Sequence, residues 1–478
     1  MTQINLAEIS TVFKILNEAV EELGVEGYVI GGYVRDYFLQ RHSSDIDIVC
    51  VGSGLKLAET FAGKVDSRHT AYYKTFGTAM VKCRVGGVDY EVEFVGARKE
   101  SYDGHSRKPA VESGTLQDDL NRRDFTINAL AISLNTKNFG ELFDPFHGIS
   151  DLNEGILRTP LDPDVTYSDD PLRMLRAVRF AAQLNFSIEN ESLHAIERNV
   201  DRISIVSQER ITDELNKIMM SPRPSTGFFI LDETSLLKKI FPEVYKLKGV
   251  EVINLRGHKD VFYHTMKVLD NVAEKSDNLW LRWAALLHDI GKPATKKYDD
   301  AIGWSFHGHE VVGSRMAAKI FSKLKLPTGD KLKYVQKLIF LHLRPQVLSD
   351  ANITDSAVRR LIYEAGEDLD DLMLLCNSDI TSANEKKIAQ FKKNFELVEQ
   401  KIVELEQKDF VRTWQPPITG EIIMQTFNLQ PSPQVGLIKN AVKDAILDGD
   451  CENNYNAAFD FMIAKGKELG LVPTNINS

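Results

Sequence analysis

The sequence GGYVRD at residues 31–36, followed by DID at residues 45–47, decides the fold of the first part of this chain. An apolar run, Tyr28-Val29-Ile30, leads into the double glycine, which precedes a turn into a helix and a second short strand. Glycine lets backbone N–H groups approach an anionic ligand closely, and the start of a helix adds favourable partial charge. This order of elements predicts a cradle for a phosphate group.

Two aspartates on the second strand suggest a metal ion beside that phosphate. Asp45 and Asp47 alternate with Ile46 and Ile48, so the two-residue period of a strand places both carboxylates on one face. Paired carboxylates next to substrate phosphates are typical ligands of Mg²⁺. A Gly-Gly turn alone, or Asp-x-Asp alone, is more often structural. Together within 17 residues they favour a nucleotidyl-transfer site like that of polymerase-beta-like nucleotidyltransferases.

The composition indicates a large globular protein. A chain of 478 residues predicts about three domains, and a hydrophobic content of 43% is enough for buried cores. No stretch approaches the roughly 18 uncharged apolar residues of a membrane span, and no signal peptide is visible. The four cysteines are widely spaced, which predicts reduced thiols in a cytoplasmic protein and argues against zinc fingers and disulfides.

The formal net charge of −10 weakens a nucleic-acid-binding interpretation without excluding it. Affinity for a polyanion depends on local basic surfaces, and two clusters can provide them. One cluster comprises Arg173, Arg176 and Arg179. The other is a lysine run, which we interpret as a solvated helical face in preference to an RNA contact; it comprises Lys319, Lys323, Lys325, Lys331, Lys333 and Lys337.

The character of the chain changes near residue 150. Before it, an amphipathic helix at about residues 6–23 precedes four strand-like stretches, with a hairpin turn at Gly86-Gly87. After it, helical periodicity dominates, and Pro222-Arg223-Pro224 marks a boundary. The expected strands are 27–30, 45–51, 78–84 and 88–95. The expected parts are a mixed α/β head over 1–150, a helical neck over 151–222, a connector over 223–257, a further helical domain over 258–380 and a helical tail over 381–478.

A third acidic group is expected on the strand after the hairpin turn. Glu91 and Glu93 alternate there and so share one face. Two-metal nucleotidyl transfer benefits from a third carboxylate that holds the metal pair or accepts the proton of the attacking hydroxyl. We take Glu93 as the candidate, with a plain surface position as the alternative.

The segment RRDFTINA at residues 122–129 is the next candidate. The adjacent Arg122 and Arg123 supply fork-shaped donors for phosphate, and Asp124 or Asn128 can hydrogen-bond ribose hydroxyls. The structural alternative is a helix capped by Asp124 and followed by an ordinary apolar face. Both roles are compatible.

The segment DDPLRMLRAVR at residues 169–179 opens a helix. Pro171 suits the first helical position, and Asp170 then caps the helix. Arg173, Arg176 and Arg179 share one side of it, where three unpaired guanidinium groups would need an anionic partner. Cytosine and adenine each present an amino donor beside a ring-nitrogen acceptor, which a carboxylate and a guanidinium match. Asp170 and Arg173 are therefore predicted to select C and A without a template.

At this point the chain resembles the class II tRNA nucleotidyltransferases, the family of CCA-adding enzymes and bacterial poly(A) polymerases. The resemblance rests on four motifs in the family's order over about 185 residues: GGYVRD with DID (31–47), RRDFTINALA (122–131), DDPLRMLRAVRFA (169–181) and SQERITDEL (207–215). It implies an α+β multidomain fold, with a nucleotidyltransferase head of mixed sheet and helices followed by an all-α neck, body and tail. One departure is Glu93, where the family commonly has aspartate.

The resemblance also implies roles for the residues of these motifs. Mg²⁺ would lie on Asp45 and Asp47, and Gly31, Gly32 and Arg35 would contact the triphosphate. The remaining roles are ribose or phosphate contacts by Arg122, Arg123 and Asp124, base selection by Asp170 and Arg173, and support of the nucleotide or its pocket by Arg176 and Arg179.

A second constellation lies in the C-terminal half. The segment LLHDIGK at residues 286–292, with an isolated histidine before it and a later aspartate, resembles the HD superfamily of metal-dependent phosphohydrolases. Imidazole and carboxylate ligands suit divalent transition metals, and two further histidines can complete a two-metal site. A single buried histidine is usually a satisfied core residue, but the full set favours a metal site and leaves a second, hydrolytic activity open. The set is His264, His288, Asp289, His309, His342 and Asp379.

The function expected from these features is addition of C, C and A to the 3′ end of tRNA from CTP and ATP, with release of pyrophosphate. The first alternative is a poly(A) polymerase or an A-adding enzyme. A poly(A) polymerase is disfavoured because residues 62–65 read AGKV instead of a basic Gly-Arg-Arg-Phe-like segment. A CC-adding enzyme is disfavoured because residues 98–109 provide a candidate flexible loop. An alternative of another class is a phosphohydrolase whose head only binds RNA, which intact Asp45 and Asp47 disfavour.

Overall fold

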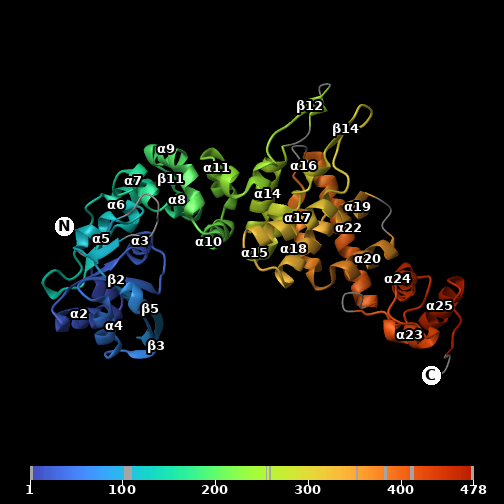
Figure 1. Ribbon diagram of the computed structural model, residues 1–478, viewed down its shortest axis with the longest axis horizontal. Helices are drawn as coiled ribbons and strands as arrows, with labels where there is room; N and C mark the ends of the chain where they lie inside the picture. Colours follow the sequence, from blue (N-terminus) through green and yellow to red (C-terminus); the bar gives the residue numbers. More distant parts are fainter. Residues whose placement is uncertain are drawn as a thin grey trace. The chain divides into compact units, whose positions relative to one another are not determined.

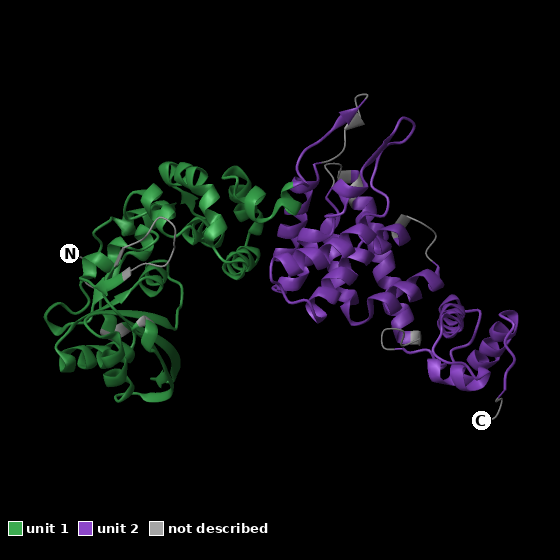
Figure 2. Cartoon of the chain, viewed as in Figure 1, with its two compact units in different colours: residues 1–245 green, residues 246–478 purple. Residues whose placement is uncertain are grey.

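The computed structural model describes residues 4–101, 110–253, 256–257, 260–350, 354–381, 385–409 and 414–474. The chain divides into two compact units, residues 1–245 and 246–478 (Figure 2). Of the expected flexible loop at residues 98–109, residues 102–109 lie outside the described part. None of the helices in the described ranges is both long and apolar enough to cross a membrane.

The head is built on a mixed sheet, which the described residues form from seven strands (Figure 1). Each neighbouring pair is antiparallel except β2 and β5, which run parallel. The strands in sheet order are β3 (Asp66–Tyr73), β4 (Thr78–Val85), β5 (Val88–Gly96), β2 (Asp45–Val51), β1 (Glu26–Ile30), β8 (Ala131–Ser133) and β9 (Leu142–Phe143). The expected α+β fold with a mixed head sheet is confirmed.

One face of this sheet is covered by helices. Ile46 and Ile48 of β2 and Phe94 of β5 are buried on that side, and Phe94 meets Phe61 of α4 (Gly54–Ala62) with ring centroids 5.4 Å apart. Because strand side chains alternate, Asp45, Asp47 and Glu93 are directed to the opposite face. The remaining elements of the head are α3 (Gly32–Phe38), β6 (Arg98–Ser101), β7 (Ala110–Ser113), α5 (Leu116–Asn121) and α6 (Gly148–Glu154).

The expected head elements differ from the observed ones in two respects. The opening helix is split into α1 (Leu6–Ile9) and α2 (Thr11–Leu23), because Ser10 is extended and its hydroxyl accepts from the Val12 N–H at 3.3 Å. Edge strand β3 was not expected, since its sequence is polar and does not alternate, and the short strands β6, β7, β8 and β9 were not expected either. The Gly86-Gly87 turn does form, with φ of 59° and 86°, the left-handed values that a two-residue hairpin turn requires.

The helical continuation of the first unit packs around α8 (Leu172–Leu184). Helices α10 (Gln208–Met219) and α11 (Pro224–Glu233) both contact α8, and the Pro-Arg-Pro segment lies between them. Pro224 occupies the first turn of α11, where a missing N–H is harmless. The other elements are α7 (Pro163–Asp169), α9 (Asn190–Asn199), α12 (Leu236–Ile240), α13 (Pro242–Tyr245) and the short parallel pair β10 (Ile156–Leu157) and β11 (Ser187–Ile188).

The described residues of the second unit form helices and two small hairpins. The hairpins are β12 (Val252–Ile253) with β13 (Arg256–Gly257), and β14 (Lys297–Asp299) with β15 (Gly303–Ser305). The larger group of helices comprises α14 (Val261–Ala273), α15 (Leu279–Leu287), α16 (Lys292–Thr295), α17 (His309–Lys323), α18 (Asp330–Leu341), α19 (Arg344–Asp350), α20 (Asp355–Ala365), α21 (Leu369–Asp379) and α22 (Glu385–Asp409). A smaller group has its own apolar core and comprises α23 (Gly420–Phe427), α24 (Pro433–Asp448) and α25 (Tyr455–Glu468).

The lysine run lies on α17, α18 and the residues between them. Lys337 pairs with Asp368 at 2.6 Å and Lys333 with Asp330 at 3.4 Å. These partners agree with the interpretation of the run as a solvated helical face.

Candidate active sites

The predicted phosphate cradle lies where β1 passes into α3. Gly31 has a φ of +73°, and a Cβ atom built on it would lie 2.7 Å from Nη1 of Arg123 and 3.4 Å from Oδ2 of Asp47. A larger residue is therefore strained here, chiefly because of the positive φ, and it would also displace the end of the Arg123 side chain. The same distances show that the glycine turn, Arg123 and Asp47 are immediate neighbours, although they are far apart in the sequence.

The three predicted catalytic carboxylates lie on adjacent strands. Asp47 is paired in register with Glu93, and Asp45 with Glu91. Burial of Asp47 and the charge of Asp45 raise the pKa of Asp47, against opposing contributions from Arg123 and Arg35. Desolvation and the charges of Asp47 and Glu91 raise the pKa of Glu93. Mutually repelling carboxylates on one open face are a donor set that fits a divalent cation.

Glu91 differs from Glu93 in its partner. Its carboxylate forms an ion pair with Lys82 of β4 at 2.7 Å. Because Lys82 pairs with Glu91, Glu93 is the better candidate for the third acidic residue of the site.

Arg35 joins the glycine motif to the RRDFTINA segment. Its Nη1 donates to Oδ1 of Asn128 at 2.9 Å, and its Nε and Nη2 donate to the carboxylate of Asp36, each at 2.9 Å. Both arginines of the segment, Arg122 and Arg123, pair with the buried Asp119. The predicted phosphate-binding side chains thus meet in one place, oriented by acidic residues of the head.

Asp124 is buried and fully engaged within the protein. Its Oδ2 accepts from Nε of Arg176 at 2.7 Å, and its Oδ1 accepts from Nδ2 of Asn128 at 3.0 Å and from the Phe125 N–H at 2.9 Å. Burial alone would raise the pKa of Asp124, but Arg176 and Asn128 outweigh it and lower the pKa to about 2. These bonds favour a positioning role for Asp124 over a direct contact with ribose.

The expectation of three unpaired guanidinium groups on α8 is wrong. Arg176 pairs with Asp124, and Arg179 pairs with Glu214 of α10 at 2.9 Å. Arg173 donates to the carbonyl oxygens of Arg122 at 2.6 Å and Thr166 at 3.3 Å. Helix α8 begins at Leu172 with Pro171 as its cap residue, and Oδ1 of the preceding Asp170 accepts from the Leu172 N–H at 3.2 Å. The fold itself therefore supplies the anionic partners of Arg176 and Arg179.

Phe180 is a member of this site that the sequence interpretation missed. The guanidinium carbons of Arg179, Arg35 and Arg176 lie 4.2, 5.1 and 5.5 Å from the centre of its ring. Cations over an aromatic face are attracted by its quadrupole. Phe180 is 6% exposed, and its place in an apolar helix pattern gave no signal of this role.

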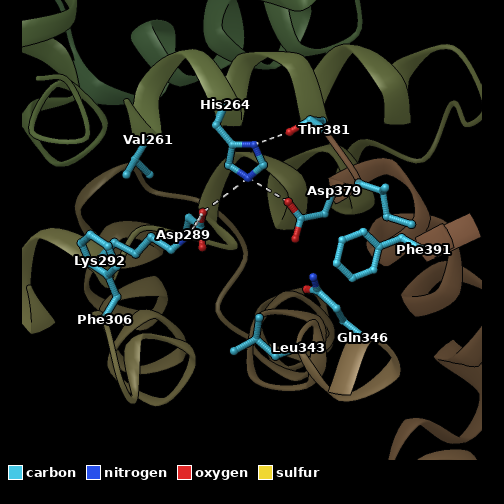
Figure 3. A pocket seen from close by; sticks show the side chains of 11 residues that line it. Val261, His264, Asp289, Lys292, Phe306, Leu343, Gln346, Asp379, Thr381 and Phe391 are labelled. Carbon is cyan, nitrogen blue, oxygen red and sulfur yellow. Dashed lines mark hydrogen bonds and ion pairs between the residues drawn. The ribbon is translucent and has the colours of Figure 1, made fainter. Parts of the chain in front are cut away.

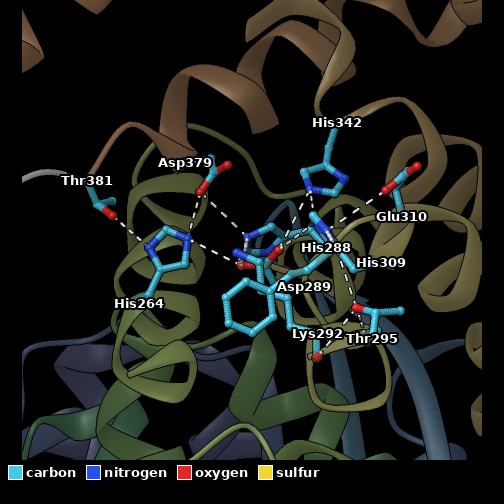
Figure 4. Close-up of polar contacts among 12 residues, drawn as sticks. His264, His288, Asp289, Lys292, Thr295, His309, Glu310, His342, Asp379 and Thr381 are labelled. Atoms are coloured by element: carbon cyan, nitrogen blue, oxygen red, sulfur yellow. Dashed lines mark hydrogen bonds and ion pairs between the residues drawn. The ribbon is translucent and has the colours of Figure 1, made fainter. Parts of the chain in front are cut away.

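The six predicted HD residues converge in the second unit (Figure 4). They form two groups, each with ligand atoms within 4.8 Å of one another: His264, His288 and Asp379, and Asp289, His309 and His342. They come from α14, from the residues after α15, from the start of α17 and from the ends of α18 and α21. Residues that are far apart in the sequence thus lie in one cluster.

Asp289 lies between the two groups. Its Oδ2 is 3.3 Å from Nε2 of His288 and 3.6 Å from Nε2 of His264. Its Oδ1 is 3.2 Å from Nε2 of His309 and 3.8 Å from Nε2 of His342. One carboxylate thus faces both groups, the arrangement of a bridging ligand in a two-metal site.

Hydrogen bonds orient the four imidazoles with Nε2 inward. Nδ1 of His288, His309 and His342 lies 2.6–2.8 Å from the carbonyl oxygens of Ala285, Phe306 and Ile339. A carbonyl can only accept, so Nδ1 of these three histidines carries a proton, and Nε2 is the ring nitrogen that can bind a metal ion. Nδ1 of His264 lies 2.7 Å from Oγ1 of Thr381, which can donate or accept, and its Nε2 lies 2.8 Å from Oδ1 of Asp379 (Figure 3). The residues fit a metal site.

Electrostatics in the cluster support this conclusion. Burial lowers the pKa of His264, and lowers that of His342 to about 4, so that both are neutral imidazoles at neutral pH. Among the described residues His288 Nε2 is buried and makes no well-aligned hydrogen bond, but Asp289 Oδ2 lies 3.3 Å and Asp379 Oδ1 3.6 Å from it. Burial would lower the pKa of His288, yet Asp289 and Asp379 raise it to about 10. These two carboxylates therefore stabilise positive charge at the imidazole of His288 itself.

A pocket of about 300 Å³ opens beside the cluster and is lined by His264, Asp289, Asp379 and Lys292 (Figure 3). Lys292 donates to Oδ2 of Asp289 at 2.6 Å. The sequence signal for Lys292 was its place three residues after Asp289 within LLHDIGK, but it was not predicted as a site residue.

Comparison with known proteins identifies both the head and the HD domain. Three family models match the chain: a poly(A) polymerase head domain over residues 27–158, a probable RNA- and SrmB-binding site of polymerase A over residues 185–247, and an HD domain over residues 261–384. A solved structure of a CCA-adding enzyme with ATP is 22% identical and has a TM-score of 0.63, covering 96% of this chain and 95% of that one. This structural similarity supports the fold described above for the chain.

Two curated relatives are closer in sequence. The A-adding tRNA nucleotidyltransferase of Deinococcus radiodurans is 32% identical over 341 residues, covering 69% of this chain and 75% of the relative. The multifunctional CCA protein of Shewanella frigidimarina is 32% identical over 374 residues, covering 74% of this chain and 83% of the relative. The chain therefore belongs to the family of tRNA nucleotidyltransferases and poly(A) polymerases, and it is an enzyme of that family with an HD domain.

Proposed function

We propose that this enzyme adds C, C and A to the 3′ end of tRNA, using CTP and ATP and releasing pyrophosphate. The observation that carries the proposal is the row of Asp45, Asp47 and Glu93 on the open face of the head's sheet, beside Gly31 and Arg123. The names of the relatives support tRNA as the acceptor. Such RNA is recognised mainly through the A-form shape and the phosphates of the acceptor arm.

In this proposal the residues of the head carry the chemistry. The 3′ hydroxyl of the tRNA attacks the α-phosphorus of the triphosphate, and the bond to pyrophosphate breaks. Asp45 and Asp47 hold Mg²⁺, which supplies charge neutralisation at the reacting phosphate when it is bound. Glu93, whose pKa is raised, helps to hold the metal pair or accepts the proton of the attacking hydroxyl. Gly31, Gly32, Arg35 and Arg123 bind the triphosphate.

Base selection falls to Asp170 and Arg173. The carboxylate accepts from the exocyclic amino group of C or A, and the guanidinium donates to the adjacent ring nitrogen. Contacts with the Leu172 N–H and with the carbonyls of Arg122 and Thr166 orient these two side chains. Guanine and uracil present a carbonyl and a ring N–H, which would leave both protein groups mispaired.

An A-adding enzyme is the second candidate for the head, because one relative is named as such. The experiment that separates the candidates uses tRNAs that end before CCA, after the first C and after both, each with CTP, ATP or both. A CCA-adding enzyme completes all three, whereas an A-adding enzyme extends only the last. Long A tails on every substrate would indicate a poly(A) polymerase. The four cysteines are free and buried, which fits a reducing compartment, and we place this reaction in the cytoplasm.

For the HD domain we propose metal-dependent hydrolysis of a phosphate ester. The six ligands, the inward Nε2 atoms and the shared Asp289 would hold two divalent transition metal ions, which supply an activated water when bound. Metal analysis after reconstitution with Mn²⁺, Ni²⁺ or Co²⁺ tests this proposal. Protein that retains no metal, or that retains it without hydrolysing any phosphate ester, would refute it.

A further inference from the structure

Asp119 is a buried carboxylate of the head that holds two arginines at once. It lies in the last turn of α5, and its side chain is fully buried. Its Oδ1 accepts from Nε of Arg122 at 2.9 Å, and its Oδ2 accepts from Nη2 and Nε of Arg123 at 3.2 and 3.3 Å. A buried charge is tolerated only when it is paired and hydrogen-bonded, and the two guanidinium groups meet this need.

Arg123 connects Asp119 to the phosphate cradle. The edge of its guanidinium with Nε and Nη2 faces Asp119, whereas Nη1 lies 2.7 Å from a Cβ atom built on Gly31 and donates to the Asn128 carbonyl at 3.4 Å. A guanidinium is planar and rigid, so a carboxylate on one edge sets the direction of the other edge. Asp119 therefore sets the direction in which Nη1 points at the cradle.

Arg122 connects Asp119 to the helix that selects the base. Asp119 holds its side chain, and its backbone carbonyl accepts from Nη2 of Arg173 at 2.6 Å. Arg173 belongs to α8, and its Nη1 donates to the Thr166 carbonyl at 3.3 Å. The side-chain and main-chain contacts of Arg122 thus form a continuous connection from Asp119 to Arg173.

Like charges give this connection its sensitivity. Arg122 and Arg123 are adjacent in the chain, and both guanidinium groups contact the same carboxylate. Two guanidinium groups at such close range repel each other unless an anion lies between them. Loss of the charge of Asp119 should therefore turn both side chains away from each other and shift the peptide that accepts from Arg173.

We propose that Asp119 is a positioning residue that orients the triphosphate-binding Arg123 and the base-selecting Arg173 together. The roles of these two arginines belong to the proposed function, on which this inference rests, and the new element is their common dependence on one buried carboxylate. A change at Asp119 should therefore alter the affinity for any triphosphate and the discrimination between bases at the same time.

The test compares full-length variants of two neighbouring residues of α5. Asp119→Asn keeps the volume of the side chain and places an amide donor against a guanidinium. Asp118→Asn is the matched control, because Asp118 accepts from the N–H and the hydroxyl of Thr115 at 2.9 and 2.7 Å and so serves the helix cap. Incorporation into tRNA lacking CCA is measured with each of the four triphosphates. Calorimetry with magnesium tripolyphosphate, which carries no base, measures phosphate binding alone.

We expect Asp119→Asn to raise KM for CTP and ATP by about tenfold and to leave kcat within about threefold of wild type. Tripolyphosphate should bind about tenfold more weakly. The ratio of kcat/KM for UTP to that for CTP should rise about fivefold. The control variant should match wild type in each of these measurements. A residue that only stabilises the fold would lower the thermal stability without moving KM or the ratio.

Wild-type KM and selectivity in a folded Asp119→Asn variant would overturn the inference, and so would an equal change in Asp118→Asn. A change in only one of the two properties, triphosphate affinity or selectivity, would overturn it as well, because the proposed dependence is common to both. If the Asn variant does not fold, Asp119→Glu, which keeps the charge and moves the carboxylate by one methylene, is judged by the same criteria.

Failure of the proposed function would look different. In that case Arg123→Ala would bind tripolyphosphate as wild type does, and Arg173→Ala would keep full selectivity. Losses in these two variants without a loss in Asp119→Asn would leave the roles of the arginines in place and remove only that of Asp119.

Discussion

Asp45 and Asp47 are the side chains on which nucleotide addition should depend most, because each contributes a carboxylate to the open face of the sheet. Asp45→Ala or Asp47→Ala should lower the rate of CTP and ATP incorporation by roughly three orders of magnitude or more. Single-turnover assays on tRNA lacking CCA measure the effect, with circular dichroism as a check of folding. Glu91→Gln, on the same face but paired with Lys82, should cost far less. A folded double alanine variant with near-normal incorporation would exclude this site.

Arg173 should control which nucleotide is accepted. Arg173→Ala removes the donor that UTP and GTP would leave mispaired, so misincorporation of both should rise. An assay with each of the four triphosphates measures the ratios of kcat/KM. The exposed Arg198, which pairs with Asp164, gives a control in Arg198→Ala. Unchanged selectivity in the Arg173 variant would disprove the base-selecting role.

The Asp124–Arg176 ion pair should make stability depend on acid pH. The pKa of Asp124 falls from 3.8 to about 2 on folding, so its contribution is present above pH 4 and is lost as the pH falls through about 2. A shift of this size is worth roughly 2 kcal/mol by linkage. Asp124→Asn should therefore be less stable than wild type in urea at pH 7, with the difference shrinking between pH 4 and pH 2. A difference independent of pH would mean that the charge of Asp124 does not stabilise the fold.

Helix α8 aligns the arginines of the nucleotide site through Phe180, whose ring meets Arg35, Arg176 and Arg179. Phe180→Leu keeps an apolar side chain and removes the ring, so KM for CTP and ATP should rise by about three- to tenfold. Phe180→Trp, which retains an aromatic face, should restore much of the loss. A loss of thermal stability with unchanged KM would show that Phe180 only fills the core.

Several elements of the head and of its sites could be predicted because their signals are local. Strand β2 was recognised from the alternation of Asp45, Ile46 and Asp47, and the hairpin turn from two adjacent glycines. The six HD residues were recognised from their order along the chain. Strand β3 was missed, since an edge strand exposes both faces and needs no alternation.

Features that depend on distant contacts could not be predicted. The acidic partners of Arg176 and Arg179 come from other segments, Asp124 and Glu214, and no spacing rule selects them. The same holds for the bridging position of Asp289, which depends on four helices meeting at one carboxylate. The sequence shows which chemical group each residue carries, whereas the residues that surround that group in space depend on how the chain packs.

The two proposed reactions should be separable, because their residues lie in different units of the chain. His288→Ala with Asp289→Ala should abolish bound transition metal and any phosphatase or phosphodiesterase activity, while CCA addition stays within about twofold of wild type. Elemental analysis and the tRNA assay measure both on one preparation. An equal loss of nucleotide addition would show that the activity of the head depends on the HD cluster.

The chain divides after Tyr245 into two units with buried residues of their own, and we expect the two units to unfold in separate transitions. A ligand stabilises only the part that binds it, by an amount set by its free concentration relative to its dissociation constant. Nucleotide would thus protect the first unit from heat and proteolysis, and metal the second. In a cell that lacks either the nucleotide or the metal, the unit without its ligand should unfold first. The rate at which that unit unfolds would then set the lifetime of the whole polypeptide.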